Sequence, residues 1–279
     1  MPVKHEEIHA RSHDNLKLFI QRWTPDSAPV RAEVVLIHGY AEHSGRYREF
    51  AHALAEQGIQ TLAVDLRGHG HSEGIRGHCD AFEHFLHDVE MTLEHAADGV
   101  PRFILGHSHG GLVTLDFVVK NTPDISGVIL SNPFLGLAMP VPAPKLFAGR
   151  LAGNFVPTLA IPSGIDASGL THDTEIVRRY ERDPMVFPTA TAGWFNEVER
   201  AQDRVKGYRD FPKPLLYLFS DCDPVASPHD NRNLAERLNG DDKTIHVRRG
   251  EKHEILNELA RHETYEVISQ WILQRSPST

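Results

Sequence analysis

The sequence has few cysteines, no excess of positive charge and no long apolar run, and each absence excludes a class of protein. Cys79 and Cys222 are the only cysteines in 279 residues, too few for a disulfide framework and not spaced as a zinc site, so both should be free thiols. The net charge of -9 argues against nucleic-acid binding, because phosphate contacts need clustered Lys and Arg. No apolar segment reaches the roughly 18 residues of a spanning helix, and the polar N-terminus has no secretory signal. We therefore expect a cytoplasmic, soluble protein.

Histidine is common instead, with 19 copies. His69, His71 and His78 lie in one glycine-rich segment and raise the question of a bound metal ion. Only Glu73 and Asp80 accompany them as carboxylates at ligand spacing, and a glycine-rich turn with polar side chains explains the same residues. We expect no metal ion and no cofactor.

Short aliphatic and β-branched runs alternate with longer segments of helical period. The predicted strands are 16–23, 33–39, 60–65, 102–107, 126–132, 214–220 and 243–249. The predicted helices are 46–58, 80–98, 111–123, 227–240 and 256–274. This alternation predicts an α/β fold with a mostly parallel central sheet and helices on both faces.

One segment, residues 133–206, breaks this alternation. Prolines recur there, among them those at positions 140, 142, 144, 157 and 162. Only two charged residues stand between positions 133 and 165. We interpret 133–206 as an inserted, mainly helical cap, and 1–132 with 207–279 as the core.

The segment GHSHGG, residues 106–111, follows a predicted strand and precedes a predicted helix. It fits the Gly-x-Ser-x-Gly pattern of a nucleophile elbow, whose tight turn raises the serine hydroxyl above the sheet. Ser108 is therefore the candidate nucleophile. The neighbouring histidine side chains should point away from its hydroxyl, but the backbone N–H of His109 begins the helix and can donate to an oxyanion.

A nucleophilic serine needs a base, and in this fold an acid precedes that base in the chain. Three histidines lie late enough in the sequence. His246 falls inside the last predicted strand and His262 inside the last helix, so His253, in the loop RRGEKHEIL, is the candidate base.

The acid is sought at the end of a strand. The run SGVIL ends in Ser-Asn-Pro and offers no carboxylate, whereas PLLYLFS is followed at once by Asp221 and Asp223. One should hold His253, and the other should be a turn residue. A second oxyanion donor should come from the loop after the strand that carries His-Gly, where Tyr40 supplies the N–H.

Four segments together are similar to one known group of proteins. They are HGYAEHSGRY (38–47), DLRGHGHSEGIRGH (65–78), GHSHGG (106–111) and SNPFLGL (131–137). The chain resembles the monoacylglycerol lipase and lysophospholipase branch of the α/β-hydrolases from about residue 8 to 275. The resemblance implies cofactor-free hydrolysis of single-chain lipid esters. It implies Ser108 as nucleophile, Asp223 as acid, His253 as base, and the N–H groups of Tyr40 and His109 as oxyanion hole.

Two positions depart from that branch. His109 stands where methionine is usual after the nucleophile, and Ser220 stands where glycine is usual three residues before the acid. Asp223 has two further arguments in its favour over Asp221. Pro224 forces it into an extended conformation, and it lies further beyond the strand, nearer the loop of His253.

The expected substrate is thus a small lipid ester, a monoacylglycerol or lysophospholipid, cleaved through an acyl-enzyme. A general carboxylesterase or thioesterase for smaller acyl groups is the alternative enzyme, and a slow, ligand-binding relative of the fold is the alternative outside enzymes. The uncharged cap can line an acyl channel, touch a membrane surface transiently, or simply pack on the core. The sequence leaves the oligomeric state open.

Overall fold

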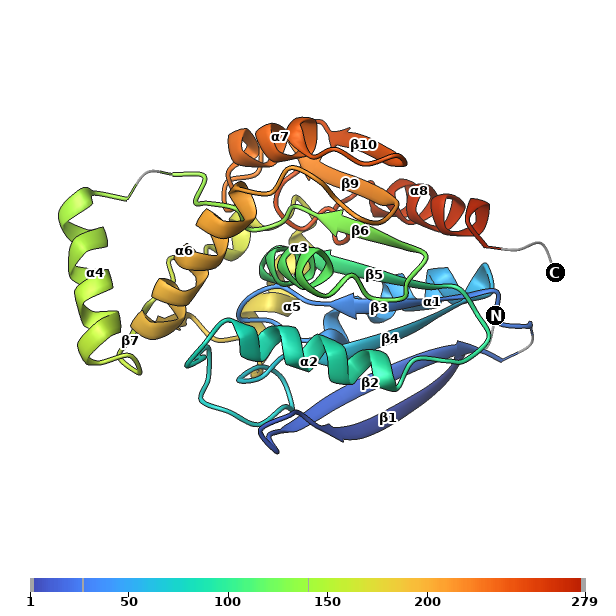
Figure 1. The fold of residues 1–279 in the computed structure, drawn as a ribbon, viewed down its shortest axis with the longest axis horizontal. Helices are drawn as coiled ribbons and strands as arrows, with labels where there is room; N and C mark the ends of the chain where they lie inside the picture. The colour runs from blue at the N-terminus through green and yellow to red at the C-terminus, as the bar shows by residue number, and fades with distance from the viewer. Residues whose placement is uncertain (1–2, 27, 140, 277–279) are drawn as a thin grey trace.

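The computed structural model describes residues 3–26, 28–139 and 141–276 (Figure 1). Within these residues the main sheet has eight strands in the order β1-β2-β4-β3-β5-β6-β9-β10. Their bounds are β1 Val3–Arg11, β2 Lys17–Pro25, β3 Ala32–Ile37, β4 Ile59–Asp65, β5 Arg102–His107, β6 Gly127–Ser131, β9 Leu215–Ser220 and β10 Lys243–Arg248. β2 runs antiparallel to both of its neighbours, and every pair from β4 to β10 is parallel. The mostly parallel sheet confirms the predicted fold class.

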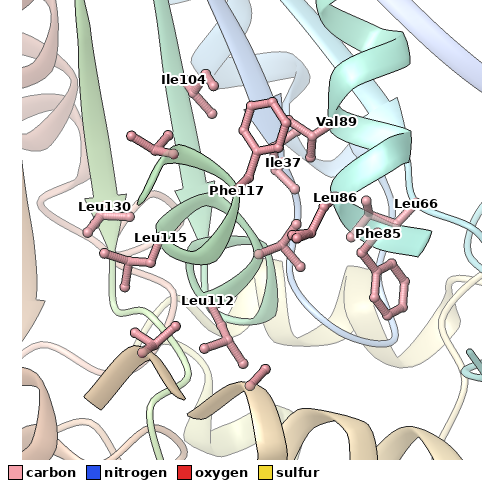
Figure 2. Packing of buried hydrophobic residues seen from close by; sticks show 14 of the residues in the cluster. Ile37, Leu66, Phe85, Leu86, Val89, Ile104, Leu112, Leu115, Phe117 and Leu130 are labelled. Atoms are coloured by element: carbon pink, nitrogen blue, oxygen red, sulfur yellow. The ribbon is translucent and has the colours of Figure 1, made fainter. Parts of the chain in front are cut away.

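Helices cover both faces of the sheet. They are α1 (Arg48–Glu56), α2 (Glu83–Glu94), α3 (His109–Asn121), α7 (Pro228–Arg237) and α8 (Arg261–Gln274). Alternate residues of β3 pack into two apolar clusters, one on each face of the sheet. Val35 and Ile37 pack with α2 and α3, whereas Val34 and Leu36 pack with α1 and α8. Figure 2 shows the first cluster between α2, α3 and the sheet. Because both faces are covered, the inner strands appear in the sequence as continuous apolar runs.

The elements between β6 and β9 lie outside the main sheet. They are α4 (Ala143–Phe155), β7 (Ala160–Pro162), η2 (Ala167–Gly169), α5 (Thr174–Arg182), β8 (Thr189–Thr191) and α6 (Ala192–Lys206). In Figure 1, α4 lies farthest from the sheet and α6 lies between α4 and α3. Arg204 of α6 ties this segment to the core, because its guanidinium donates to both carboxylate oxygens of buried Asp116 in α3. Pro140 of the predicted cap, and residues 1–2, 27 and 277–279 of the predicted core, lie outside the described residues.

Three short or exposed strands were not predicted. β1 is an edge strand that pairs only with β2 and leaves most of its side chains in solvent, so its sequence lacks an apolar pattern. β7 and β8 form a separate antiparallel pair of three residues each, too short for a periodic signal. In the described part of the chain, no helix combines the length and the hydropathy needed to cross a membrane.

Candidate active site

Ser108 lies at the turn between β5 and α3, in a backbone conformation that side-chain-bearing residues rarely adopt. Its φ is 52° and its ψ is -117°. The glycines beside it are needed for space: a Cβ on Gly106 would lie 2.4 Å from Thr114 Oγ1, and one on Gly110 would lie 2.2 Å from the carbonyl oxygen of Ile37. The strand and helix therefore pack too closely for larger residues, and the chain holds Ser108 in a strained turn.

The structure brings Ser108, His253 and Asp223 together from three separate parts of the chain. His253 Nε2 lies 2.8 Å from Ser108 Oγ, and His253 Nδ1 lies 2.7 Å from Asp223 Oδ2. All three residues are buried, with at most 6% of their surface exposed. One imidazole ring thus bridges a hydroxyl and a carboxylate, the arrangement in which a histidine can take a proton from a serine.

The two aspartates after β9 have different contacts. Asp223 Oδ1 accepts hydrogen bonds from the N–H groups of Val225 and Ala226, at 2.8 and 2.9 Å, which leaves Oδ2 for His253. Asp221 is exposed, and its Oδ1 accepts from the N–H of Gly250 at 2.8 Å, so it links the turn after β9 to the turn after β10. Asp221 thus makes a turn contact, whereas Asp223 is the aspartate hydrogen-bonded to His253.

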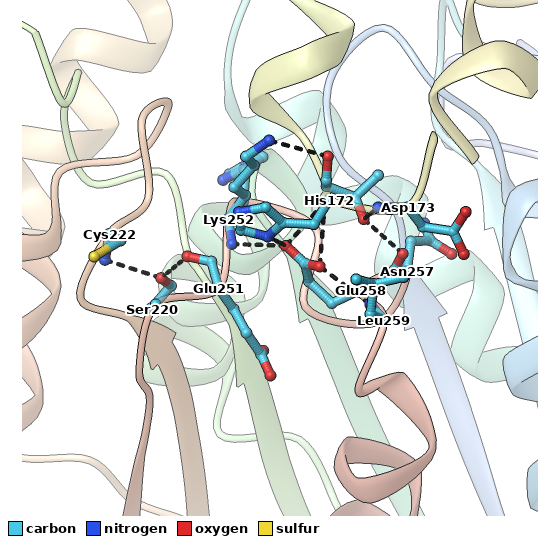
Figure 3. Close-up of polar contacts among 12 residues, drawn as sticks. His172, Asp173, Ser220, Cys222, Glu251, Lys252, Asn257, Glu258 and Leu259 are labelled. Carbon is cyan, nitrogen blue, oxygen red and sulfur yellow. Dashed lines mark hydrogen bonds and ion pairs between the residues drawn. The ribbon is translucent and has the colours of Figure 1, made fainter. Parts of the chain in front are cut away.

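Ser220 and the residues around His253 form a polar framework (Figure 3). The Ser220 hydroxyl donates to the carbonyl oxygen of Glu251 and accepts from the N–H of Cys222. Glu258 accepts from the N–H of Lys252 at 2.9 Å and lies 2.8 Å from Nδ1 of His172. These bonds hold the loop before His253 to β9 and to the segment between β6 and β9. Ser220 therefore supplies a link that glycine could not.

The neighbouring rings of His253 and His107 have pKa values shifted in opposite directions. Burial of the His253 ring disfavours its protonated form, but the Asp223 carboxylate and, to a lesser degree, other nearby carboxylates together outweigh burial and raise the pKa of His253 above its ordinary value. His107, whose ring centre lies 4.9 Å from that of His253, has its pKa lowered to about 4 by burial and then by the positive charge of His253. His253 is thus the ring that carries a proton most readily here, and His107 stays neutral.

The loop after β3 is fixed by a buried glutamate that sequence reasoning missed. Glu42 Oε1 accepts from the N–H of Gly39 at 2.6 Å and from the hydroxyl of Tyr47 at 2.7 Å. Burial disfavours its charge, yet Arg46 and other nearby groups hold the pKa of Glu42 at about 2. Tyr40 follows Gly39, so this anchor sets the direction of the Tyr40 N–H.

Arg46 extends this network to the histidine loop. Its guanidinium donates to Glu42 at 2.6 Å and to both oxygens of Glu254 at 2.7 Å, and it lies over the ring of Tyr180 in α5. Four charged or aromatic groups from three segments of the chain meet here. The available sequence signal was the set of charged residues in AEHSGRY, directly after the predicted strand.

His109 places its backbone and its side chain in different surroundings. It is the first residue of α3, where backbone N–H groups have no acceptor within the helix. Its ring is completely buried against Phe85 and Trp194, and neither ring nitrogen has a hydrogen-bond partner in the described structure. Burial, followed by the nearby His38, lowers the pKa of His109 to about 3. The ring is therefore neutral and packs as an apolar group.

A cavity that opens to solvent lies above Ser108. Gly39, Tyr40, Ser108 and His253 form its floor. Apolar side chains supply most of its walls, among them Phe134, Leu137, Leu146, Ile161, Ile165 and Trp194. Most of the walls therefore come from the segment between β6 and β9, and the cavity suits a mainly apolar ligand with its polar end at the serine.

The three histidines of the glycine-rich segment have separate contacts. His69 is buried with Nδ1 2.9 Å from the carbonyl oxygen of Arg67, and the N–H of His71 donates to Asp65. His78 lies between Thr191 and an exposed aspartate. The described side chains of this segment serve the turn and its packing.

An α/β-hydrolase fold with a serine at its strand-to-helix turn, hydrogen-bonded to a histidine, defines a serine hydrolase. Residues 28–260 match the family described as serine aminopeptidase, S33. A monoacylglycerol lipase of Mycolicibacterium smegmatis is 31% identical over 90% of this chain and 91% of its own length. The crystal structure of a monoacylglycerol lipase from Paleococcus ferrophilus, 28% identical, superposes with a TM-score of 0.83 over 99% of this chain and 100% of that one.

An uncharacterized abhydrolase domain-containing protein of Dictyostelium discoideum is 34% identical over 94% of this chain, which spans 28% of that longer protein. The chain belongs to the S33 family of serine hydrolases and is a monoglyceride-lipase-like carboxylic ester hydrolase. The resemblance stated from the sequence is thereby confirmed.

Proposed function

We propose that the protein hydrolyses carboxylic esters of single-chain lipids, monoacylglycerols or lysophospholipids, through a covalent acyl-enzyme. The observation that carries the proposal is the double hydrogen bond of His253, to Ser108 on one side and to Asp223 on the other. Ser108 Oγ attacks the ester carbonyl while His253 takes its proton. The N–H groups of Tyr40 and His109 stabilise the oxyanion, and His253 then protonates the leaving alcohol. In the second half of the reaction, water takes the place of the alcohol: it attacks the acyl-enzyme while His253 takes its proton, and the fatty acid is released.

The cavity supports a lipid rather than a short acyl group. Its mainly apolar walls suit a fatty acyl chain. We assign residues 133–206 the role of a cap over the core, because this segment supplies most of those walls. The proposal does not depend on whether the substrate's polar head group contains a phosphate. A comparison of monoacylglycerols with lysophospholipids in the assay decides which head group is preferred.

The outer side of the cap supports transient contact with a membrane surface or lipid aggregate. Large apolar side chains on and beside α4 are exposed, because nothing in the described chain covers them. They are Met139, Phe147, Leu151, Phe155, Val156 and Leu159. Phe155 is 78% exposed and Met139 is 73% exposed. Such a group of exposed apolar side chains near the cavity is suited to withdrawing a lipid from an interface.

The proposal is tested with a chain-length series of monoacylglycerols and p-nitrophenyl esters, using the wild-type protein and Ser108→Ala. The variant removes the attacking oxygen and little volume, so it should fold and have no ester hydrolysis above background. Rates for the wild type should rise from two to twelve carbons, because each buried methylene adds about 0.8 kcal/mol of binding. A folded Ser108→Ala protein with near wild-type turnover would refute the nucleophile. A flat or falling series would instead favour a general carboxylesterase or thioesterase.

A further inference from the structure

Two elements far from the catalytic serine in sequence bring nitrogen and carboxylate ligands together. His13 and Asp14 lie in the turn between β1 and β2, and His84 lies in the first turn of α2. One ligand atom from each of these three side chains lies within 4.8 Å of the other two. Neither element could form this group by itself, so the group results from packing α2 beside the β1–β2 turn.

A second histidine of α2 adds an independent observation. His87 is one helical turn after His84, and its ring centre lies 4.0 Å from that of His13. Its Nδ1 is shielded from solvent and has no hydrogen-bond partner in the described structure. Burying a nitrogen without a hydrogen-bond partner costs free energy of folding. His87 Nδ1 is such an unsatisfied nitrogen, and it lies next to the three candidate ligands.

The local charge tolerates a cation. The Arg67 guanidinium lies beside the group, but it donates to two carboxylates, Asp14 at 2.8 Å and Asp88 at 2.7 and 2.8 Å. Two negative charges thus face one positive charge. A divalent ion would therefore meet a net negative environment. Asp14 Oδ1 accepts from both Arg67 and the N–H of Leu16, whereas Oδ2 accepts from Arg67 alone and keeps a lone pair for an ion.

We propose that His13, Asp14 and His84 form a binding site for a borderline divalent transition-metal ion of the zinc type. Two imidazoles and one carboxylate favour such an ion over Mg²⁺ or Ca²⁺, which prefer sets of oxygen ligands. Tetrahedral coordination at about 2.0–2.1 Å needs ligand atoms roughly 3.3 Å apart, whereas here they lie within 4.8 Å of one another. Asp14 is held by Arg67, so the exposed side chain of His13 would close this gap by rotation. Water would complete the coordination.

The ion would join β1, the exposed edge strand, to α2. It takes no part in ester hydrolysis and is therefore separable from the proposed function. The expected effect is stabilisation, because an ion that binds the folded chain and not the unfolded one raises the melting temperature with its concentration.

The test is calorimetric titration of ZnCl₂ into the full chain after EDTA treatment, with a thermal melt at each zinc concentration. The variants are His13→Gln and His84→Gln, which remove one ligand each. His246→Gln is the matched control, because His246 is an exposed histidine of β10 outside the group. Circular dichroism verifies folding of each variant, and MgCl₂ replaces ZnCl₂ in a parallel titration.

We expect one zinc ion per chain, at least tenfold weaker binding in both ligand variants, unchanged binding in His246→Gln, and no binding of Mg²⁺. The zinc-dependent rise in melting temperature should be lost with the binding. Equal affinity of His13→Gln, His84→Gln and wild type would overturn the proposal, as would the absence of a one-to-one phase. Equal binding of Mg²⁺ would overturn it too, because a diffuse acidic surface would then explain the data. The rate of ester hydrolysis should be the same with and without zinc.

Discussion

Replacing Asp223 by asparagine should remove nearly all activity through the hydrogen bonding of a single imidazole. Asp223 Oδ1 accepts from two backbone N–H groups, and an asparagine would keep its carbonyl oxygen there. The amide NH₂ would then take the place of Oδ2, which lies 2.7 Å from Nδ1 of His253. Two donors cannot face one another, so the ring would place its proton on Nε2 instead. Nε2 could then no longer accept the proton of Ser108.

The expected loss is large enough for a simple assay. A wrong imidazole tautomer in a serine triad lowers kcat by about four orders of magnitude. At about 1.36 kcal/mol for each factor of ten, that is roughly 5.4 kcal/mol of transition-state stabilisation. The size and shape of the side chain barely change, so the unfolding midpoint in urea should stay near that of the wild type.

Asp221→Asn is the matched control. Its Oδ1 accepts one hydrogen bond from the N–H of Gly250 at 2.8 Å, and an asparagine oxygen can replace it. We expect a rate within about threefold of wild type and a loss of at most ~1 kcal/mol in stability. Both variants are assayed at saturating ester. An inactive Asp221→Asn beside an active Asp223→Asn would refute this reasoning and move the acid to Asp221.

Three further predictions concern pH and packing. Glu254→Gln should move the acid limb of the kcat/KM profile to lower pH, because the Glu254 carboxylate helps to raise the pKa of His253, which must be neutral to act as base; an unmoved or rising limb would contradict this. His109→Met should raise the free energy of unfolding in urea by about 1–2 kcal/mol at pH 7.5, since it removes two buried nitrogens without partners. The gain should grow below pH 6.5, where the unfolded chain protonates His109 while burial keeps the folded pKa at about 3, at up to about 1.4 kcal/mol per pH unit; equal gains at pH 7.5 and 5.5 would contradict this. Gly110→Ala should fail to give folded protein by circular dichroism, because its Cβ would lie 2.2 Å from the carbonyl oxygen of Ile37; a soluble, active Gly110→Ala protein would show that the strand and helix can separate.

Local sequence determined much of the fold and the position of the serine. The inner strands are buried on both faces, so each appears as an apolar run, and the covering helices repeat apolar residues every three or four positions. The elbow around Ser108 is equally local, because a strand, a tight turn and a helix need small residues within a few positions. The edge strand β1 escaped prediction for the opposite reason: its side chains face water and carry no periodic signal.

The tertiary structure alone decided the contacts between distant residues. His253 and Ser108 are 145 positions apart and touch only because β5 and the loop after β10 end at the same edge of the sheet. The aspartate that faces His253, the Glu42–Arg46–Glu254 network and the lining of the cavity all depend on such contacts. Periodicity and turn chemistry act over about four residues, whereas these distances are set by packing of whole strands and helices. The sequence therefore determined which groups are present, and packing decided which of them meet.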